Sequence, residues 1–350
     1  MGNKKVNGLF VLVIVFSLLM SACGNTAAVE PTASVSAPEP AAAATEAATE
    51  LPTANLVPTE VPLSGSIRVS GAFALYPMMT VWADEFTKLH PDVQFDVQGG
   101  GAGKGMTDTI AGAVDIGMIS RSIKEEESSQ GIFWVSVTKD AAFPLINEKN
   151  PVAADILAKG ISQETFNKIF ITGEYKTWGD VVGRPEVTDA INVYTRTDSS
   201  GAAEMWAKFS GGKAQDEIVG IGVNGEPALV NTVLTDPLGI GYANLNSTFD
   251  LSTGKVIAGI VVPPIDVNKN GVADEGENLN QKDAAVTAIA DGLYPSPPAR
   301  FENLATKGKP TGLTLEFIKW ILTDGQQYLD SAGYVPLTAE QQAESLGKLK

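Results

Sequence analysis

The sequence predicts an α/β fold, because segments with the periodicity of strands alternate with segments that have the periodicity of helices. Val93, Phe95 and Val97 alternate with polar residues, as in a half-buried strand. Just before them, apolar residues recur at helical spacing from Met78 to Leu89. Strands and helices that alternate in this way are typical of α/β proteins.

Each expected element follows from its own residues. Pro77 suits the first turn of the helix that ends near His90, which we expect to be a helix C-terminal residue. The remaining elements are expected in this order: a strand at 67–69, the helix from 78 to 89, a strand at 93–97, a glycine-rich turn at 99–105, a helix at 106–111, a strand at 114–118, a strand at 191–194 and a helix at 202–209.

Four turns between a strand and a helix are expected, at 71–77, 99–105, 120–122 and 196–201. The start of a helix has unpaired N–H groups and the positive end of the helix dipole, so such turns can bind anions. Arg196 adds a fixed charge with a fork of donors. The alternative for 196–201 is an ordinary Ser/Asp helix cap. The glycine run lacks the spacing of a nucleotide P-loop.

The composition limits the classes of function. The chain has 350 residues, enough for two lobes, with 44% hydrophobic and 19% charged residues. Its net charge of −16 argues against nucleic-acid binding. The single histidine argues against a Ser-His-Asp hydrolase and a multi-histidine metal centre. No general base, catalytic metal site or cofactor loop is visible, so we expect no enzyme and no organic cofactor.

The N-terminus resembles the signal peptide of a bacterial lipoprotein. Lys4 and Lys5 precede the apolar stretch 9–20, which is short for a membrane span. Small residues before Cys23 resemble a lipobox, so residues 1–22 are expected to be removed and Cys23 lipidated. The next segment, 23–64, is rich in Ala, Thr, Pro and Glu and is expected to be a disordered tether. The protein is then exported and anchored to the outer face of the cell membrane.

The ordered motifs of the folded part resemble the PstS-type substrate-binding lipoproteins of bacterial phosphate ABC transporters. The matching stretches are 70–77, 98–105, 115–121, 143–151, 169–178, 196–201, 294–300 and 325–337. The resemblance implies a type II periplasmic-binding-protein fold, with two α/β lobes joined by a two-crossing hinge. It also implies a monomer that captures phosphate and delivers it to an ABC permease.

The resemblance also implies lobe boundaries and site residues. The first lobe would contain 65–143 and 244–350, and the second 144–243. The oxyanion would meet residues carried over by position: Ala74, Leu75, Tyr76, Ala102, Arg121, Arg196, Asp198, Ser200, Gly201 and Ala202.

Several of these positions depart from the family pattern. Hydroxyl residues are usual in the first turn, where this chain has 72–75 as Ala-Phe-Ala-Leu, and at the positions of Ala102 and Ala202, so only backbone N–H groups remain there. Some members have an aspartate in place of Arg121, which accepts the proton of hydrogen phosphate. Asp198 is then either a proton acceptor or the group that holds Arg196, and we favour the latter. Alternatives are a receptor for sulfate, molybdate or tungstate, and a calcium-stabilised surface scaffold without a small ligand.

A second motif, at 266–277, fits the calcium-binding loop of an EF-hand. Oxygen-bearing side chains stand at positions 1, 3, 5, 9 and 12, with glycine at position 6. The expected Ca²⁺ ligands are Asp266, Asn268, Asn270, the Val272 carbonyl, Asp274 and a bidentate Glu277. Pro263 and Pro264 exclude a regular incoming helix, so we expect a structural rather than a sensing role, in lobe one. The alternative is a solvated polar turn.

Overall fold

The computed structural model describes residues 62–350. The expected signal peptide, Cys23 and all but the end of the expected tether lie outside the described residues. Within 62–350, no helix has both the length and the apolar character needed to cross a bilayer.

The main sheet has the strand order β2-β1-β3-β11-β4-β8-β6-β7, with β9 paired to β4. Strands β1, β2 and β3 are mutually parallel, as are β8, β6 and β7, whereas β11 is antiparallel to β3 and β4 and β4 is antiparallel to β8. These strands are β1 (Gly65–Gly71), β2 (Val93–Gly99), β3 (Ile116–Ile119), β4 (Ile132–Asn147), β6 (Asn192–Arg196), β7 (Ile221–Val223), β8 (Gly239–Asn244), β9 (Ile260–Val261) and β11 (Ala299–Lys307). A separate parallel pair joins β5 (Ile161–Ser162) to β10 (Ile265–Asp266).

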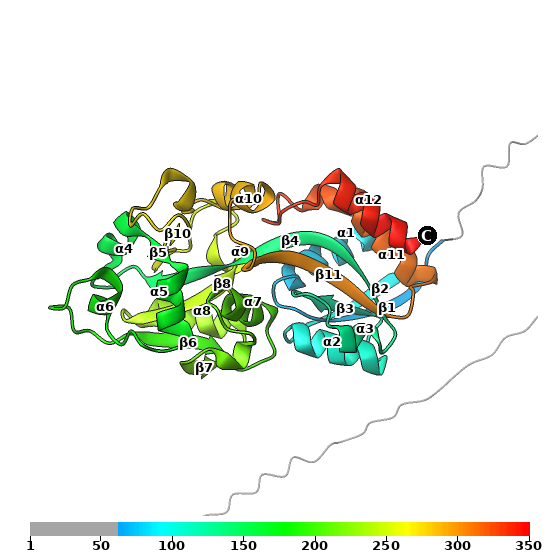
Figure 1. The fold of residues 1–350 in the computed structure, drawn as a ribbon. Coiled ribbons are helices and arrows are strands. Elements are labelled where there is room, and N and C mark those ends of the chain that lie inside the picture. The colour runs from blue at the N-terminus through cyan, green and yellow to red at the C-terminus, as the bar shows by residue number, and fades with distance from the viewer. Residues whose placement is uncertain (1–61) are drawn as a thin grey trace, which may run out of the picture. The chain divides into compact units, whose positions relative to one another are not determined.

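Helices cover both halves of this sheet (Figure 1). They are α1 (Tyr76–Leu89), α2 (Ala102–Ala111), α3 (Glu125–Ser128), α4 (Ala153–Lys159), α5 (Gln163–Phe170), α6 (Trp178–Val182), α7 (Gly201–Phe209), α8 (Glu226–Thr235), α9 (Leu245–Thr248), α10 (Lys282–Ala290), α11 (Gly312–Leu322) and α12 (Ala339–Leu349).

The α/β prediction is confirmed, and most expected elements differ from the structure by one or two residues. Pro77 lies in the first turn of α1, and His90 is its C-cap. The largest difference is α2, which begins at Ala102 rather than at residue 106. Helix α2 can start there because Gly101, with a φ of 87°, reverses the chain immediately before it.

The buried apolar side chains form two separate cores. The first core takes its residues from 67–137 and 304–349, whereas the second takes almost all of its residues from 141–299. The long strand β4 runs from one core to the other, and β11 carries the chain back (Figure 1). Two crossings therefore connect the cores.

The expected lobe division differs from these cores in one region. Residues 244–299 were expected in lobe one, but their buried side chains, such as Phe249, Ile265 and Tyr294, belong to the second core. The physical reason is that β9 pairs with the second half of β4 and β10 pairs with β5, both of which are in the second core.

Candidate oxyanion-binding site

The turn before α2 packs directly against the turn before α7. The N–H of Gly103 donates to the Ser199 carbonyl oxygen at 3.1 Å. A Cβ added to Gly103 would lie 2.0 Å from Ser199 Oγ, so only glycine permits this approach. A Cβ on Gly101 would similarly lie 2.8 Å from Asp198 Oδ2. Two turns from opposite cores therefore touch at the ends of their strands.

The other two turns reach the same place. A Cβ added to Gly201 would lie 2.1 Å from Ser120 Oγ, so the end of β3 touches the start of α7. The Phe73 ring, in the first turn, lies 5.3 Å from the Arg196 guanidinium carbon. All four strand-to-helix turns thus meet around Arg196 and the start of α7.

Arg196 lies at the end of β6 with 5% of its surface exposed. Its Nε donates to Asp198 Oδ1 at 2.7 Å, its Nη2 donates to Asp198 Oδ2, and its Nη1 lies 3.4 Å from Glu226 Oε2. A guanidinium has five N–H donors. Two of them therefore have no partner within residues 62–350. Asp198 also accepts from the Gly225 N–H at 2.9 Å, so its carboxylate is fixed and holds Arg196 in one orientation.

Ser200 caps α7, as the simpler interpretation of this turn predicts. Its Oγ accepts from the Ala203 N–H at 3.3 Å, and its own N–H donates to Gln215 Oε1 at 2.8 Å. The N–H groups of Gly201 and Ala202 have no recorded partner among the described residues. The cap and the anion site are therefore compatible, because the cap uses one N–H and leaves two.

The first turn offers fewer donors than expected. The N–H groups of Leu75 and Tyr76 already donate to the Ala72 carbonyl, at 3.2 and 3.1 Å, and Tyr76 is 38% exposed. The Ala74 carbonyl accepts from the Tyr334 hydroxyl at 2.6 Å. Of the three expected residues of this turn, Ala74 alone has an N–H without a partner within 62–350. Ala102 is buried and is the first residue of α2, and its N–H has no partner within 62–350.

Arg121 differs most from its expected role. Its Nη1 and Nη2 donate to the two carboxylate oxygens of Glu127 at 2.9 and 2.6 Å, and its Nε lies 3.4 Å from Glu204 Oε2. Its guanidinium is thus bound by two carboxylates rather than directed at an anion. Arg121 follows β3 of the first core, whereas Glu204 lies on α7, which packs in the second core. The Arg121–Glu204 ion pair therefore connects the two cores.

The structure also contains a buried polar network next to Arg196, which the sequence did not predict. Glu226, 1% exposed, contacts Arg196 and accepts from the side chain of Asn244. Asn244 in turn accepts from Arg300, which also donates to Asp140 Oδ2 at 3.2 Å. These residues are far apart in the chain, and although Arg300 lies in a stretch that resembles the family, no local pattern pairs it with the others.

Two carboxyl groups in this network have altered pKa values. Burial raises the pKa of Asp140 to about 6, although the positive charge of Arg300 lowers it. Burial also raises the pKa of Glu302 well above its usual range, again opposed by Arg300. Both groups face the single Arg300 guanidinium, at 3.2 and 3.3 Å. One positive charge cannot balance two buried carboxylates, so the pKa values of both groups stay raised.

No group of three His, Cys, Asp or Glu side chains in the described part of the chain could alone hold a metal ion. The expected calcium loop contains three carboxylates, Asp266, Asp274 and Glu277, which do not form such a group; its other expected ligands are two amides and a backbone carbonyl.

The fold and site together define a two-lobed ligand-binding protein. A family model described as a PBP superfamily domain matches residues 39–325, and the chain belongs to this superfamily. The predicted type II periplasmic-binding-protein fold is thereby confirmed.

Particular relatives agree with this class. The chain is 27% identical to the phosphate-binding protein PstS of Bacillus subtilis over 338 aligned residues. The alignment covers 96% of this chain and 95% of the relative. It is 24% identical over 306 residues to PstS of Pseudomonas aeruginosa, covering 82% and 88%.

Solved structures show the same fold. A putative phosphate ABC transporter substrate-binding protein with bound phosphate, from Clostridium perfringens, superposes with a TM-score of 0.63 at 22% identity, over 78% of this chain and 100% of that chain. An ABC-type phosphate transport receptor from Vibrio cholerae gives a TM-score of 0.58 at 22% identity, over 77% and 100%.

Proposed function

We propose that this protein is an extracytoplasmic receptor that captures inorganic phosphate between two lobes and delivers it to an ABC importer. The observation that carries the proposal is the buried Arg196, whose inner edge is fixed by Asp198 while two of its N–H groups have no partner within 62–350. The relatives named as phosphate-binding proteins agree with this ligand.

In this proposal, phosphate is held by donors from both lobes. Arg196 supplies charge and a fork of N–H groups, and Gly201 and Ala202 supply N–H groups at the start of α7. Ala74 and Ala102 supply N–H groups from the first lobe. Ser120, which lies against Gly201, offers a hydroxyl at the start of α7. No bond is made or broken, so binding is closure of the two lobes around a dehydrated anion, without catalysis.

The cellular setting is also part of the proposal. Cys23 would carry the lipid, and residues 23–64 would tether the folded part to the outer face of the membrane. The receptor would act as a monomer that presents its lobes to a permease.

Calorimetric titration of the full chain with phosphate tests this function, after exhaustive dialysis against phosphate-free buffer. We expect one phosphate per chain, and we expect Arg196→Lys to weaken binding by about a hundredfold because a lysine cannot form the fork. Arg184→Lys is a matched control, since Arg184 pairs with two exposed carboxylates away from the site. Unchanged affinity in Arg196→Lys would refute the site.

Competition at fixed ionic strength separates phosphate from other oxyanions. Displacement of phosphate by an equal concentration of sulfate would identify a less selective receptor, as the arginine at position 121 permits. A chain that binds calcium but gives no heat with phosphate would instead be a scaffold.

A further inference from the structure

We propose that the loop of residues 266–277 is a calcium site that stabilises the second lobe. The loop leaves β10, which pairs with β5, and ends in a single 3₁₀ turn at Glu275–Glu277. The Ala273 N–H also donates to the Ala158 carbonyl at 3.0 Å, at the end of α4. The loop is therefore attached to the second core at both its start and its middle, and not to lobe one as the sequence suggested.

The expected ligands turn toward one another. Asp266 accepts from the N–H groups of Asn270 and Gly271, at 3.1 and 3.0 Å. The amides of Asn268 and Asn270 both donate to Asp274 Oδ2, at 2.6 and 3.0 Å. The side chains at positions 3, 5 and 9 of the loop thus contact one another, and the carboxylate at position 1 binds the backbone at positions 5 and 6.

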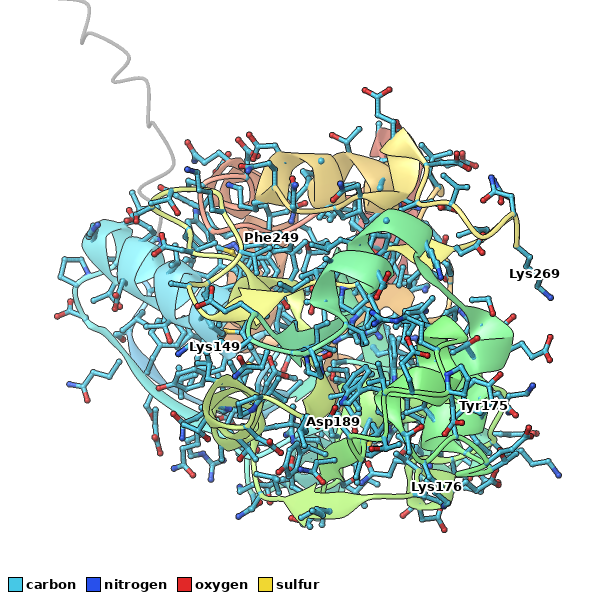
Figure 2. All side chains as sticks on the ribbon, turned by 90° about the vertical axis from the view of Figure 1, so that its left-hand side faces the viewer. Lys149, Tyr175, Lys176, Asp189, Phe249 and Lys269 are labelled. Carbon is cyan, nitrogen blue, oxygen red and sulfur yellow. The ribbon has the colours of Figure 1, made fainter. Side chains whose placement is uncertain are left out.

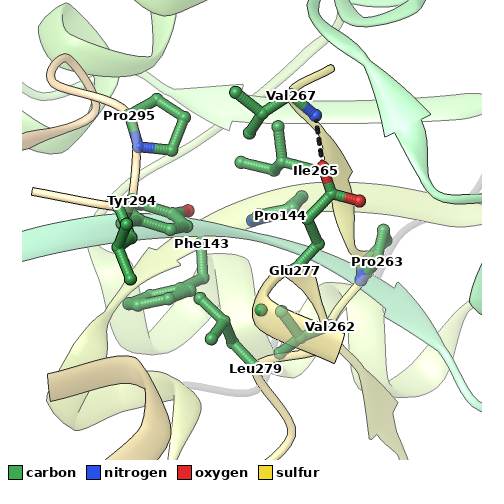
Figure 3. Close-up of a pocket in the computed structure, with 12 residues that line it drawn as sticks. Phe143, Pro144, Val262, Pro263, Ile265, Val267, Glu277, Leu279, Tyr294 and Pro295 are labelled. Carbon is green, nitrogen blue, oxygen red and sulfur yellow. Dashed lines mark hydrogen bonds between the residues drawn. The ribbon is translucent and has the colours of Figure 1, made fainter. Parts of the chain in front are cut away.

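Glu277, at position 12, binds the backbone at both ends of the loop. Its Oε1 accepts from the Val267 N–H at 2.7 Å (Figure 3). Its Oε2 accepts from the Asp274 N–H at 3.2 Å. A single carboxylate therefore joins the second and ninth positions of the loop. Position 12 is the one from which a calcium loop supplies its bidentate carboxylate.

A second and independent observation is the uncompensated charge. Asp266 is only 6% exposed, and no lysine, arginine or histidine forms an ion pair with Asp266, Asp274 or Glu277 in the described part of the chain. The nearby Lys269 extends outward from the loop (Figure 2). A buried carboxylate without a countercharge is costly, and a bound cation removes that cost.

The ligand set selects the ion. All six expected donors are oxygen atoms, and each asparagine oxygen that accepts one N–H keeps a second lone pair. A flexible set of carboxylates, amides and one carbonyl suits Ca²⁺ better than Mg²⁺, which requires stricter octahedral geometry. Lys269 and Gly271, with φ of 61° and 74°, give the loop its tight turn.

The site acts on the lobe rather than on the anion. Glu277 lines an apolar pocket together with Phe143, Pro144, Ile265, Leu279 and Tyr294 (Figure 3). A bound ion that holds Glu277 in place would therefore stabilise one side of this pocket. Phe143 and Pro144, which also line it, belong to β4 just after that strand has passed from the first core to the second. Calcium is expected to stabilise the second lobe and to leave phosphate affinity unchanged.

The test uses the full chain after treatment with a chelating resin. Equilibrium dialysis with calcium alone should show one ion per chain, and calcium should raise the melting temperature by several degrees, with magnesium much less effective. Glu277→Gln should lower calcium affinity by about tenfold or more. Glu275→Gln is the matched control, because Glu275 lies in the same loop at a position that is not a ligand.

Two outcomes would overturn the proposal. One is a melting temperature of the parent protein that is the same with and without calcium. The other is equal calcium affinity in Glu277→Gln, Glu275→Gln and the parent. Phosphate titration of the calcium-free protein tests the anion site separately. A negative result for calcium binding therefore does not affect the phosphate measurement, and a negative result for phosphate does not affect the calcium measurement.

Discussion

Gly201 at the start of α7 lies directly against Ser120 at the end of β3. A Cβ added to Gly201 would lie 2.1 Å from Ser120 Oγ and 2.4 Å from the Ser120 carbonyl oxygen. Because Ser120 directly follows a strand of the first core and α7 packs in the second, this contact exists only when the two halves are together. The glycine therefore permits both the helix start and the closed arrangement.

Gly201→Ala should reduce phosphate affinity by about tenfold or more, because the added methyl group would clash with Ser120 and push the two halves apart. Gly347→Ala is the control, since a Cβ there meets nothing within 4 Å and alanine favours the helix. Calorimetry measures the affinities. Parent-like affinity in Gly201→Ala would show that these halves need not touch during binding.

Asp198→Asn distinguishes the two roles considered for this carboxylate. If Asp198 only positions Arg196, the substitution weakens phosphate and sulfate binding by similar factors, because both anions lose the same oriented donor. We expect this result. A selective loss of phosphate affinity, measured by competition at constant pH, would instead identify Asp198 as an acceptor of the phosphate proton.

Glu204→Gln should weaken phosphate binding by roughly threefold to tenfold while changing stability little. The reason is that the Arg121–Glu204 pair, at 3.4 Å with both side chains mostly buried, joins the two halves in their closed arrangement. Glu164→Gln is a matched control, because Glu164 pairs with Lys168 on one exposed helix face, where such pairs contribute little. Equal affinities in the two variants would exclude a role for Arg121 in closure.

Glu302→Gln should fold, and its free energy of unfolding should increase relative to that of the parent as the pH rises. Since burial raises the pKa of Glu302 well above 4.5, the folded state binds its proton more tightly than the unfolded state does. The parent therefore loses stability from this group as the pH rises above the unfolded value, and glutamine, which stays neutral, does not. Asp140, with a pKa of about 6, adds a similar loss between about pH 4 and 6 in both proteins.

Urea unfolding at acidic and neutral pH measures this difference. The variant of an exposed carboxylate on α11, Glu316→Gln, should show no such trend. A Glu302→Gln protein that is less stable than the parent at neutral pH would mean that Glu302 is ionised there.

Much of the fold could be predicted from local pattern. The alternation at Val93, Phe95 and Val97 places β2, and the helical spacing before Leu89 places α1, because burial on one face imposes these periods on the sequence. The succession of expected strands and helices also placed four turns that the structure brings together. Local pattern was less accurate where a single glycine, Gly101, allowed a helix to begin early.

The sequence by itself determined the elements, the glycine turns, Arg196 with its neighbour Asp198, and the spacing of the loop at 266–277. Only the tertiary structure decided that Arg121 pairs with Glu127 and Glu204, and that 244–299 pack in the second core. It alone placed Arg300 beside Asp140, 160 positions away. The physical reason is that periodicity and turn chemistry act over a few neighbouring residues, whereas the partner of a buried charge is set by which distant strands pack together.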